Sequence, residues 1–347
     1  MPKTTPTLAE IATAAGVSTM TASRAVNHQP GVSRSTRDAI LKLAHNMGYV
    51  ANRSAQKLSG GRSRVIGLLA SDLGNAFTSA LVSGAVQAVA AAGNEVLIYS
   101  LVDRAQRPND NVLQLLQQFT DGVIAILPYQ FGFVESLSAA QVPVVTIDQH
   151  TTVSSIAAFP SVASDSYGGS RSAMQHLAAL GHRRIAFITG DERMHSARDR
   201  HRAYDDAVAI LGLERDPALV LPGDYSLYGG RTAAQQLLAL PVRPTAVFAA
   251  NDLSALGAMA VLQTAGLRVP QDISVVGFDD LEAASLVHPG LTTVRQPIAD
   301  MGRAAANTLL ALIAGLDVAT QQVSLPTELV VRASTAACKR VGKAPKK

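Results

Sequence analysis

The sequence of 347 residues has a single cysteine, few aromatic residues and no long apolar run. Cys338 has no second thiol with which to form an internal disulfide or a cysteine metal cluster, so we expect a reducing compartment, no metal site and no redox role. No stretch of about 18 uninterrupted apolar residues occurs, and we therefore expect no membrane-spanning helix. The first residues lack the apolar core of a secretory signal, which predicts that the protein stays in the cytoplasm.

Several short motifs typical of enzymes are also missing. The sequence contains no G-x-G-x-x-G, G-x-x-x-x-G-K-[ST], H-E-x-x-H or G-x-S-x-G pattern. A single S-x-x-K match at 54–57 stands in a glycine-containing linker without partner residues, and we attribute it to chance. We therefore expect neither enzymatic activity nor a cofactor.

What the sequence does contain is an uneven distribution of charge over a largely apolar chain. Hydrophobic residues make up 48% of it, which excludes a disordered chain, and its length suits two or three domains. Residues 1–64 carry nine Lys or Arg against two acidic residues, whereas residues 65–338 carry 16 basic and 24 acidic residues. A basic head on an acidic body is typical of a protein whose head meets phosphate groups. The basic residues 339–347 are a second polyanion contact or, as we expect, a disordered end.

The first 50 residues have the pattern of three short helices. Thr7 and Glu10 fit a capping box, and Ser18 is placed to cap a second helix over 19–27 after a turn of about three residues. So short a turn between two helices predicts a helix-turn-helix. Ser33 begins a third helix. The residues on one face of the second helix, opposite Ala22 and Ala25, are Thr19, Met20, Ser23, Arg24 and Asn27.

Beyond residue 64, apolar strand-like runs alternate with amphipathic helices. Strands are expected at 65–69, 96–99, 123–127, 144–147, 185–189, 246–249 and 273–278. Helices are expected at 77–92, 112–119, 168–180, 197–211, 253–265 and 298–313. This alternation predicts two parallel sheets wrapped by helices, with ligands at the carboxyl ends of the strands. The polar residues that follow the strands, and are therefore pocket candidates, are Ser71, Asp148, Asn251, Asp252, Asp279 and Asp280.

The linker at 52–63 contains Gly-Gly and basic side chains, and it includes Asn52, Arg53, Ala55 and Leu58. An isolated helix of two turns is marginal in water. We expect this segment to form a helix only against a partner.

These residues together resemble the lactose/galactose repressor family of bacterial transcription regulators. The resemblance covers nearly the whole chain, in the segments LAEIATAAGVSTMTASRAVN, LGHRRIAFITG, PTAVFAANDLSALGAM and LPTELVVRAST. It implies an all-α helix-turn-helix head, a hinge helix that folds on DNA, and an α/β body of two lobes with parallel sheets, similar to type I periplasmic binding proteins. It also implies a near-palindromic double-stranded DNA operator as partner, a homodimer, and no membrane partner.

For the head, the resemblance implies two kinds of DNA contact. Thr19, Met20 and Arg24 match base-reading positions, although Met20 departs from the polar residue common there. Leu58 matches a hinge leucine that inserts into the minor groove. The other implied DNA-binding residues are Thr7, Ser18, Thr21, Ser23, Asn27, Ser33, Asn52, Arg53 and Ala55. The alternatives are an exposed helix face without a target, and a Leu58 that packs on the body.

For the body, the resemblance implies a pocket for a small effector, and the chemistry of its residues suits a sugar or sugar-like polyol. Carboxylates and amides hold pairs of hydroxyls, an arginine adds a charged donor, and an aromatic face covers C–H surface. The implied effector-binding residues are Ser71, Asn75, Phe77, Asp148, Ser196, Arg200, Tyr225, Asn251 and Asp279. Alternatively, Asn251 or Asp252 caps a helix, Asp279 is a solvated strand end and Tyr225 belongs to the core. Ala203 and Ile298 depart from the family pattern and are expected to reshape the pocket wall.

The expected domains are a head at 1–50, a hinge at 51–64, a body at 65–338 and a tail at 339–347. The first lobe is expected at 65–162 and 296–322, and the second at 163–295 and 323–338. The leading hypothesis is a repressor of carbohydrate-utilisation genes whose operator affinity depends on the effector. A sugar-binding transport receptor shares the body, but it would need an export signal and no basic head. An enzyme is the third class, and turnover of a ligand would favour it.

Overall fold

The structure, a computed structural model, describes residues 6–27, 29–49, 62–70, 72–100, 110–126, 136–148, 159–318 and 322–338. The chain forms two units, Met1–Ser63 and Arg64–Lys347, which are treated separately below. The tail at 339–347 and five predicted site residues lie outside the described residues; these five are Asn52, Arg53, Ala55, Leu58 and Ser71.

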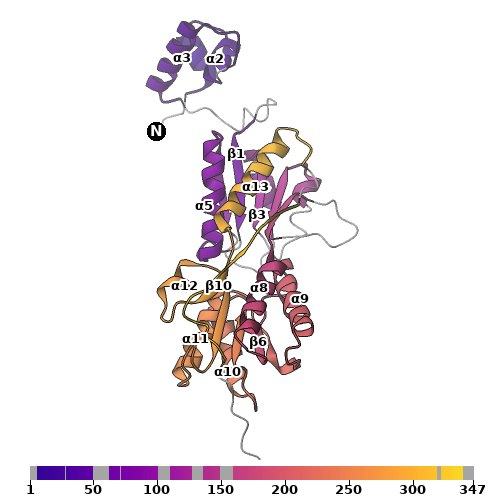
Figure 1. Ribbon diagram of the computed structural model, residues 1–347. Coiled ribbons are helices and arrows are strands. Elements are labelled where there is room, and N and C mark those ends of the chain that lie inside the picture. Colours follow the sequence, from indigo (N-terminus) through magenta and orange to yellow (C-terminus); the bar gives the residue numbers. More distant parts are fainter. Residues whose placement is uncertain are drawn as a thin grey trace, which may run out of the picture. The chain divides into compact units, whose positions relative to one another are not determined.

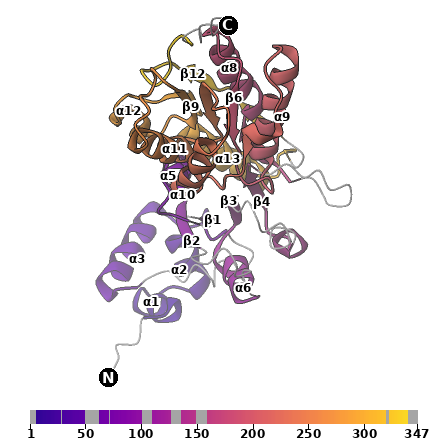
Figure 2. The same cartoon turned by 90° about the horizontal axis from the view of Figure 1, so that it is seen from below.

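The head consists of α1 (Leu8–Ala14), α2 (Thr19–Val26) and α3 (Arg34–Met47), grouped in Figure 2. The predicted capping box is present, since the Thr7 hydroxyl accepts from the Glu10 amide while the Glu10 carboxylate accepts from the Thr7 amide. Gly48, with a φ of 72°, ends α3 in the left-handed conformation that glycine adopts without strain. The helices enclose a small core of Ile11, Ala25, Ile40 and Ala44. The helix-turn-helix fold of the head is confirmed.

Two six-stranded sheets form the body. Figure 1 labels β1 and β3 of the first sheet and β6 and β10 of the second. The first sheet is parallel throughout and has the order β11-β5-β4-β3-β1-β2. Its strands are β1 (Val65–Ala70), β2 (Glu95–Ser100), β3 (Gly122–Ile126), β4 (Val144–Ile147), β5 (Ser161–Ser164) and β11 (Gln322–Leu325). Its described helices are α5 (Ala76–Ala91), α6 (Asp110–Phe119) and α13 (Ile298–Ile313).

The second sheet has the order β12-β10-β9-β8-β6-β7, in which only the β10–β12 pair is antiparallel. Its strands are β6 (Ile185–Ile188), β7 (Val220–Leu221), β8 (Ala246–Ala249), β9 (Ser274–Asp279), β10 (Thr292–Arg295) and β12 (Glu328–Val330). Its helices are α8 (Ser166–Ala179), α9 (His195–Ile210), η1 (Pro217–Leu219), α10 (Leu227–Leu238), α11 (Asp252–Thr264) and α12 (Glu282–Leu286). The predicted α/β body of two lobes is confirmed.

Alternation along the strands explains why each sheet is covered on both faces. In β3, Ile124 and Ile126 pack toward α5 and α13, while Val123 and Ala125 pack toward α6. In the second sheet, Phe187 of β6 packs on the side of α8 and α9, which lie side by side in both views, and Ile188 packs on the side of α10 and α11. Parallel strands buried on both faces are apolar at nearly every position, as the sequence pattern indicated.

Glycine allows α5 and α13, which lie far apart in the sequence, to pack side by side in the first lobe (Figure 1). A Cβ at Gly84 of α5 would lie 1.9 Å from the carbonyl oxygen of Ala299, and one at Gly302 of α13 would lie 2.0 Å from that of Leu81. Both distances are impossible for a real side chain. The two helices therefore meet backbone to backbone, and this contact fixes where α5 begins at the edge of the sheet.

The chain crosses between the sheets three times, and hydrogen bonds tie the crossings together. The amide of Asp165 donates to the carbonyl of Leu325 over 2.8 Å, and the Thr327 hydroxyl donates to the carbonyl of Asp165 over 3.1 Å. The Ser164 hydroxyl donates to the side-chain oxygen of Gln296.

The lobe limits expected from the sequence need a correction. The limits at 162/163 and 322/323 cut through β5 and β11, yet both strands lie whole in the first sheet. They pair with each other from Gln322–Ser161 to Leu325–Ser164, and so the lobe changes only after each strand has ended.

Among the described residues, no helix has both the length and the apolar character needed to span a membrane.

Candidate functional site

The second helix of the head, α2, has one buried face and one exposed face. Ala22 and Ala25 are fully buried, whereas Thr19, Met20 and Arg24 are exposed, with 65% of Met20 accessible. The guanidinium of Arg24 has no hydrogen-bond partner among the described residues, and its Nη1 lies so close to Gly31 that a Cβ added to that glycine would be 3.2 Å away. A guanidinium held against backbone with its donors available suits the bidentate contact that guanine offers in the major groove.

Three predicted DNA-binding residues cap the helices of the head. The hydroxyls of Thr7, Ser18 and Ser33 accept from the amides of Glu10, Thr21 and Thr36 at 3.3, 3.1 and 3.2 Å. All three caps are exposed, so the positive ends of the helix dipoles face solvent, where phosphate groups are stabilised. At the end of α2, the side-chain amide of Asn27 donates to the Ser23 hydroxyl at 3.3 Å. The head therefore presents local, solvent-facing donors.

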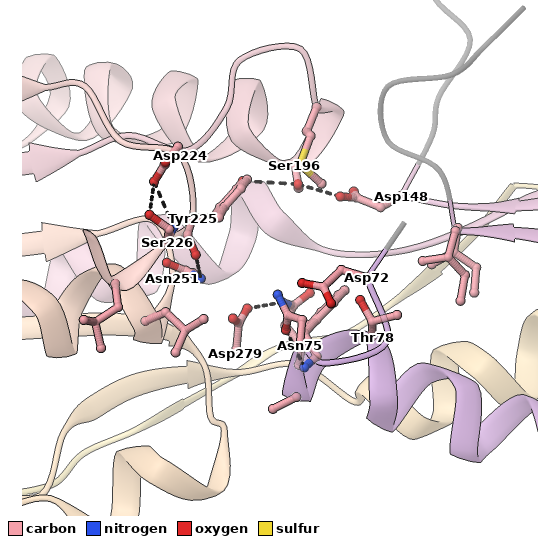
Figure 3. A pocket seen from close by; sticks show the side chains of 18 of the residues that line it. Asp72, Asn75, Thr78, Asp148, Ser196, Asp224, Tyr225, Ser226, Asn251 and Asp279 are labelled. Atoms are coloured by element: carbon pink, nitrogen blue, oxygen red, sulfur yellow. Dashed lines mark hydrogen bonds between the residues drawn. The ribbon is translucent and has the colours of Figure 1, made fainter. Parts of the chain in front are cut away.

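In the body, a cavity of about 470 Å³ lies where the carboxyl ends of the two sheets meet (Figure 3). It is lined by Asp72, Gly74, Asn75, Ala76, Phe77, Thr78, Ile126, Ile147, Asp148, Met194, Ser196, Arg200, Asp224, Tyr225, Ser226, Leu227, Asn251, Leu253, Asp279 and Gln296. Eight of the nine predicted effector-binding residues are therefore brought together, and the ninth, Ser71, lies outside the described residues.

Arg200 of α9 is buried, and its charge is held by several neighbours. Its Nη1 donates to the carbonyl of Ala250 at 2.5 Å, and its Nε and Nη2 share the hydroxyl of Ser166 at 3.3 Å. The guanidinium stacks on Phe278 with 3.7 Å to the ring centroid, and its Nη1 lies 4.0 Å from a carboxylate oxygen of Asp279. The side chain is thus fixed in one orientation at the pocket wall.

Asp279 ends β9 and is buried, so it is not a solvated strand end. Its carboxylate accepts from the amide nitrogen of Gln296 at 2.6 Å. Burial raises the pKa of Asp279 to about 7, although Arg200 and Gln296 act in the opposite direction. A buried carboxylate is removed from bulk water and here accepts few hydrogen bonds from the protein. Hydroxyl groups of a ligand can therefore stabilise it by donating further hydrogen bonds.

A hydrogen-bonded chain joins the two lobes across the cavity. The hydroxyl of Ser196, at the start of α9, donates to Asp148 at the end of β4 over 2.6 Å. The Ser196 oxygen also lies 3.3 Å from the hydroxyl of Tyr225 (Figure 3). Burial raises the pKa of Tyr225 to about 12, so this hydroxyl keeps its proton at neutral pH.

Tyr225 forms a fixed aromatic wall. A Cβ at Gly190 would lie 2.2 Å from the Cζ of Tyr225, so the ring lies directly on the backbone of this glycine. Tyr225 has a φ of 64°, Asp148 one of 57° and Asp279 one of 124°. Three side chains of one cavity thus rest on left-handed backbone, a costly conformation that is frequent where a site must be held in one geometry.

Asn251 and Asn75 both line the cavity and both cap a helix. The Asn251 side chain accepts from the Ser254 amide at 3.0 Å, which caps α11, and donates to the carbonyl of Tyr225 at 3.0 Å. Asn75 caps α5 through the Phe77 amide at 2.9 Å. The capping role foreseen for Asn251 is thus present beside its place in the cavity.

Four residues singled out from the sequence do not line the cavity. Asp252 is the buried first residue of α11, and its carboxylate accepts from the Leu281 amide and the Thr293 hydroxyl. Asp280 pairs with Arg295 and Arg332. Ala203 and Ile298 are buried in the hydrophobic core rather than at the cavity. The expectation that Ala203 and Ile298 reshape the pocket wall is wrong, because both side chains pack between helix and sheet.

Sequence reasoning missed several lining residues, chiefly Gln296, Asp224, Ser226, Thr78 and Asp72. Gln296 follows β10, a strand of four residues that was not predicted, and Asp224 and Ser226 follow β7, which has only two. The one available signal was local: Ser226 stands where a helix cap is needed, and its hydroxyl accepts from Gly229.

The cavity combines polar groups that bind hydroxyls with an apolar wall that includes Phe77, Ile126 and Ile147. No group of three or more potential ligands for a metal ion occurs among the described residues. The arrangement can hold a small molecule by hydrogen bonds from both lobes.

Comparison with known proteins agrees with this geometry. Residues 7–52 match the bacterial regulatory proteins of the lacI family, and residues 174–335 match a periplasmic binding protein-like domain. The HTH-type transcriptional regulator DegA of Bacillus subtilis (strain 168) is 32% identical over 333 residues, which cover 95% of this chain and 98% of DegA. The chain belongs to the lacI family. The resemblance inferred from the sequence is therefore confirmed.

Other members of the lacI family are similarly close. The HTH-type transcriptional repressor CytR of Escherichia coli (strain K12) is 31% identical over 96% of this chain and 98% of CytR. Among solved structures, the lac repressor dimer bound to operator and the anti-inducer ONPF has a TM-score of 0.83 and 32% identity, over 96% of this chain and all of that one. A complex of the regulator CelR with cellobiose has a TM-score of 0.73 and 33% identity, over 95% and 99%. These relatives are named as transcription regulators, and not as enzymes.

Proposed function

We propose that this lacI-family regulator is a repressor of carbohydrate-utilisation genes whose operator affinity is set by a small sugar-like effector held between its two lobes. The observation that carries the proposal is the cavity in which Asp148 of the first lobe and Ser196 of the second are hydrogen-bonded across a cleft lined by further polar groups of both lobes. A ligand that touches both lobes favours one closure over another.

The DNA half of the proposal rests on the head. Thr19, Met20 and Arg24 read bases, and the capping residues Thr7, Ser18 and Ser33 approach phosphates, together with Thr21, Ser23 and Asn27. In the hinge, Asn52, Arg53, Ala55 and Leu58 contact DNA when the linker folds, with Leu58 in the minor groove. The lac repressor structure, which is a dimer bound to operator, supports a homodimer on a near-palindromic site.

The effector half rests on the cavity and on the CelR–cellobiose complex. Asn75, Phe77 and Asp148 contact the effector from the first lobe, and Ser71 belongs with them. Ser196, Arg200, Tyr225, Asn251 and Asp279 contact it from the second lobe. The effector changes DNA binding only if its affinity differs between two arrangements of the lobes that differ in how far they are closed. Tight binding that is equal in both arrangements has no effect.

Two experiments test the proposal. Operator duplexes are selected from a random pool with the full chain, and their affinity is measured between roughly 50 and 200 mM salt. Steep salt dependence and a near-palindromic consensus support the DNA half, while equal affinity for random duplexes contradicts it.

For the effector half, sugars are screened by thermal shift, since a ligand at about 100 times its Kd adds about 2.7 kcal/mol of stability. Each stabilising sugar is then added to the operator complex. A change in operator affinity supports control by the effector, and an unchanged affinity with every bound sugar contradicts it.

A further inference from the structure

The charged groups of the cavity are strongly unequal in sign. The lining residues that the structure describes include four carboxylates, from Asp72, Asp148, Asp224 and Asp279, but a single cation, Arg200. Figure 3 shows these carboxylates on several sides of the cavity, from loops of both lobes. A ligand in this cavity is therefore surrounded by acceptors of hydrogen bonds, and the carboxylates among them outnumber the one cation.

The positive charge of Arg200 is already shared with groups of the protein. Its Nη1 is bonded to Ala250 and its Nε and Nη2 to Ser166, while its plane lies on the ring of Phe278. Its nearest carboxylate is Asp279, at 4.0 Å, which already acts as its counter-ion. The Nε–Nη2 side of the guanidinium is thus occupied by Ser166, and the N–H groups that remain on Nη1 and Nη2 lie beside the carboxylate of Asp279.

The helix N-termini around the cavity do not provide an anion site either. The first turns of α5, α10 and α11 are capped by Asn75, Ser226 and Asn251 of the protein itself. The N-terminus of α9 has no cap of its own, but the hydroxyl of Ser196 in its first turn is bonded to Asp148 from the other lobe. The position that a ligand anion would take at α9 is thus next to a carboxylate of the protein.

From these contacts we infer that the effector is a hydroxyl-rich molecule without negative charge, a neutral sugar, glycoside or amino sugar, and that sugar acids and sugar phosphates are excluded. This inference rests on the proposed function. Carboxylate oxygens accept from hydroxyl and ammonium groups, whereas a second carboxylate or a phosphate meets repulsion that a partly buried site screens poorly. The apolar side of the cavity, with Phe77, Ile147 and Leu253, fits the C–H face of a sugar ring.

Chemically matched ligands test the inference. Each neutral sugar of a panel of hexoses, pentoses, disaccharides and nucleosides is compared, where such forms exist, with its amino, uronic acid and phosphate forms. The full chain is screened by thermal shift at neutral pH and constant ionic strength, and the affinity of each stabilising ligand is measured by calorimetry. We expect a binder among the neutral or amino forms, with its acid form bound at least about tenfold more weakly.

Two other results would contradict the inference, and they differ in what they mean for the proposed function. A uronic acid or sugar phosphate that binds more tightly than its neutral counterpart overturns the inference, but it leaves the proposed function standing. A panel in which no form of any sugar binds overturns the proposed function, and the inference fails with it.

A pair of variants locates the origin of the selectivity. Asp224 lies at the cavity and accepts from the amide and hydroxyl of Ser226, which asparagine can still do through its oxygen. Asp224→Asn is expected to reduce the preference for the neutral over the acid form at least about threefold. The matched control Asp205→Asn removes an exposed carboxylate of α9 that does not line the cavity. An unchanged preference in Asp224→Asn, or an equal change in both variants, contradicts the inference.

Discussion

The head and the pocket are built from similar polar residues but hold them in opposite ways. In the head, Thr7, Ser18 and Ser33 each bond to a residue three positions further along the chain. In the pocket, Ser196 bonds to Asp148, and Gln296 bonds to Ser164, a residue 132 positions away. A local contact survives without the rest of the fold, whereas a distant one exists only when both lobes are in place.

This difference indicates which substitutions alter DNA binding by the head separately from effector binding by the pocket. The exposed side chains of the head form only local bonds, so their substitution changes DNA binding while any loss of stability stays within the head. The buried groups of the pocket, such as Asp279 and Arg200, are linked to each other and to both lobes, so their substitution changes binding and stability together.

The largest expected effect is on the head. Arg24→Ala removes a base-reading fork from each of two heads, at about 1–3 kcal/mol per fork, so a dimer loses about 2–6 kcal/mol of operator affinity. Affinity for a random duplex falls much less, and the unfolding of the body stays unchanged. Titrations of both proteins with the selected and a random duplex, at one salt concentration, give the loss of affinity for each duplex. An equal loss on both duplexes means that Arg24 contacts phosphate and does not read bases.

A second effect belongs to the pocket and depends on pH. Since the pKa of Asp279 is raised to about 7 in the folded protein, the folded state holds a proton that the unfolded state has already lost, and stability falls as pH rises from about 4 to about 7. Asp279→Asn removes this loss. The variant is therefore expected to be more stable than wild type above pH of about 7, by a few kcal/mol, with a difference that shrinks toward pH of about 4.

Thermal unfolding of both proteins across this range measures the effect. Asp205→Asn, which removes an exposed carboxylate of the same lobe, serves as the control and should follow wild type. A constant difference between Asp279→Asn and wild type at every pH would show that Asp279 is ionised throughout.

A smaller effect tests whether the caps of the head are local. Ser18→Ala removes the cap of α2 and is expected to cost about 1 kcal/mol of head stability, within a range of about 0.5–2. Effector binding by the body should not change. Thr13→Ala is the control, because its hydroxyl bonds only to Ala9 within α1. Chemical-shift changes that spread from α2 into the body would contradict a local role.

The smallest expected effect concerns the crossings between the lobes. Ser164→Ala leaves the side-chain oxygen of Gln296 without its donor and is expected to cost about 1 kcal/mol of body stability. Ser172→Ala, whose hydroxyl bonds to Gly168 one turn earlier in α8, should cost less. Equal unfolding midpoints for the two variants would mean that the bond between the crossings adds nothing to the stability of the body.

The same contrast explains what the sequence could predict. The capping box at Thr7, the cap at Ser18 and the start of α3 at Ser33 depend on neighbours in the chain, and each was predicted. The buried strands β1, β3, β4, β6, β8 and β9 were also predicted, because both their faces are apolar. The strands β5, β10 and β11 were not, because polar residues interrupt the apolar run in SVAS, TTVR and QVSL, and neither were β7 and β12, which have three residues or fewer.

In the pocket, the residues carried by the family resemblance were brought together, whereas Gln296 and Asp224 were missed. Their place depends on pairing between strands that the sequence does not indicate, such as β10 beside β9. Asp252 and Asp280 were taken as pocket candidates because they follow strands, but neither lines the cavity, and their carboxylates bond to other groups of the protein. A polar residue at a strand end marks the edge of the sheet, and it does not specify which side of that edge it faces.

The central claim, that an effector in the pocket controls the head, is tested most directly by paired operator titrations. Wild type and Asp279→Asn are each titrated with the selected operator, with and without the sugar identified by the thermal-shift screen. The claim predicts that both bind the operator alike without the sugar, and that the variant needs a higher sugar concentration, by about 1.5–3 kcal/mol of lost affinity, for the same response. A variant that responds at the wild-type sugar concentration would contradict the claim.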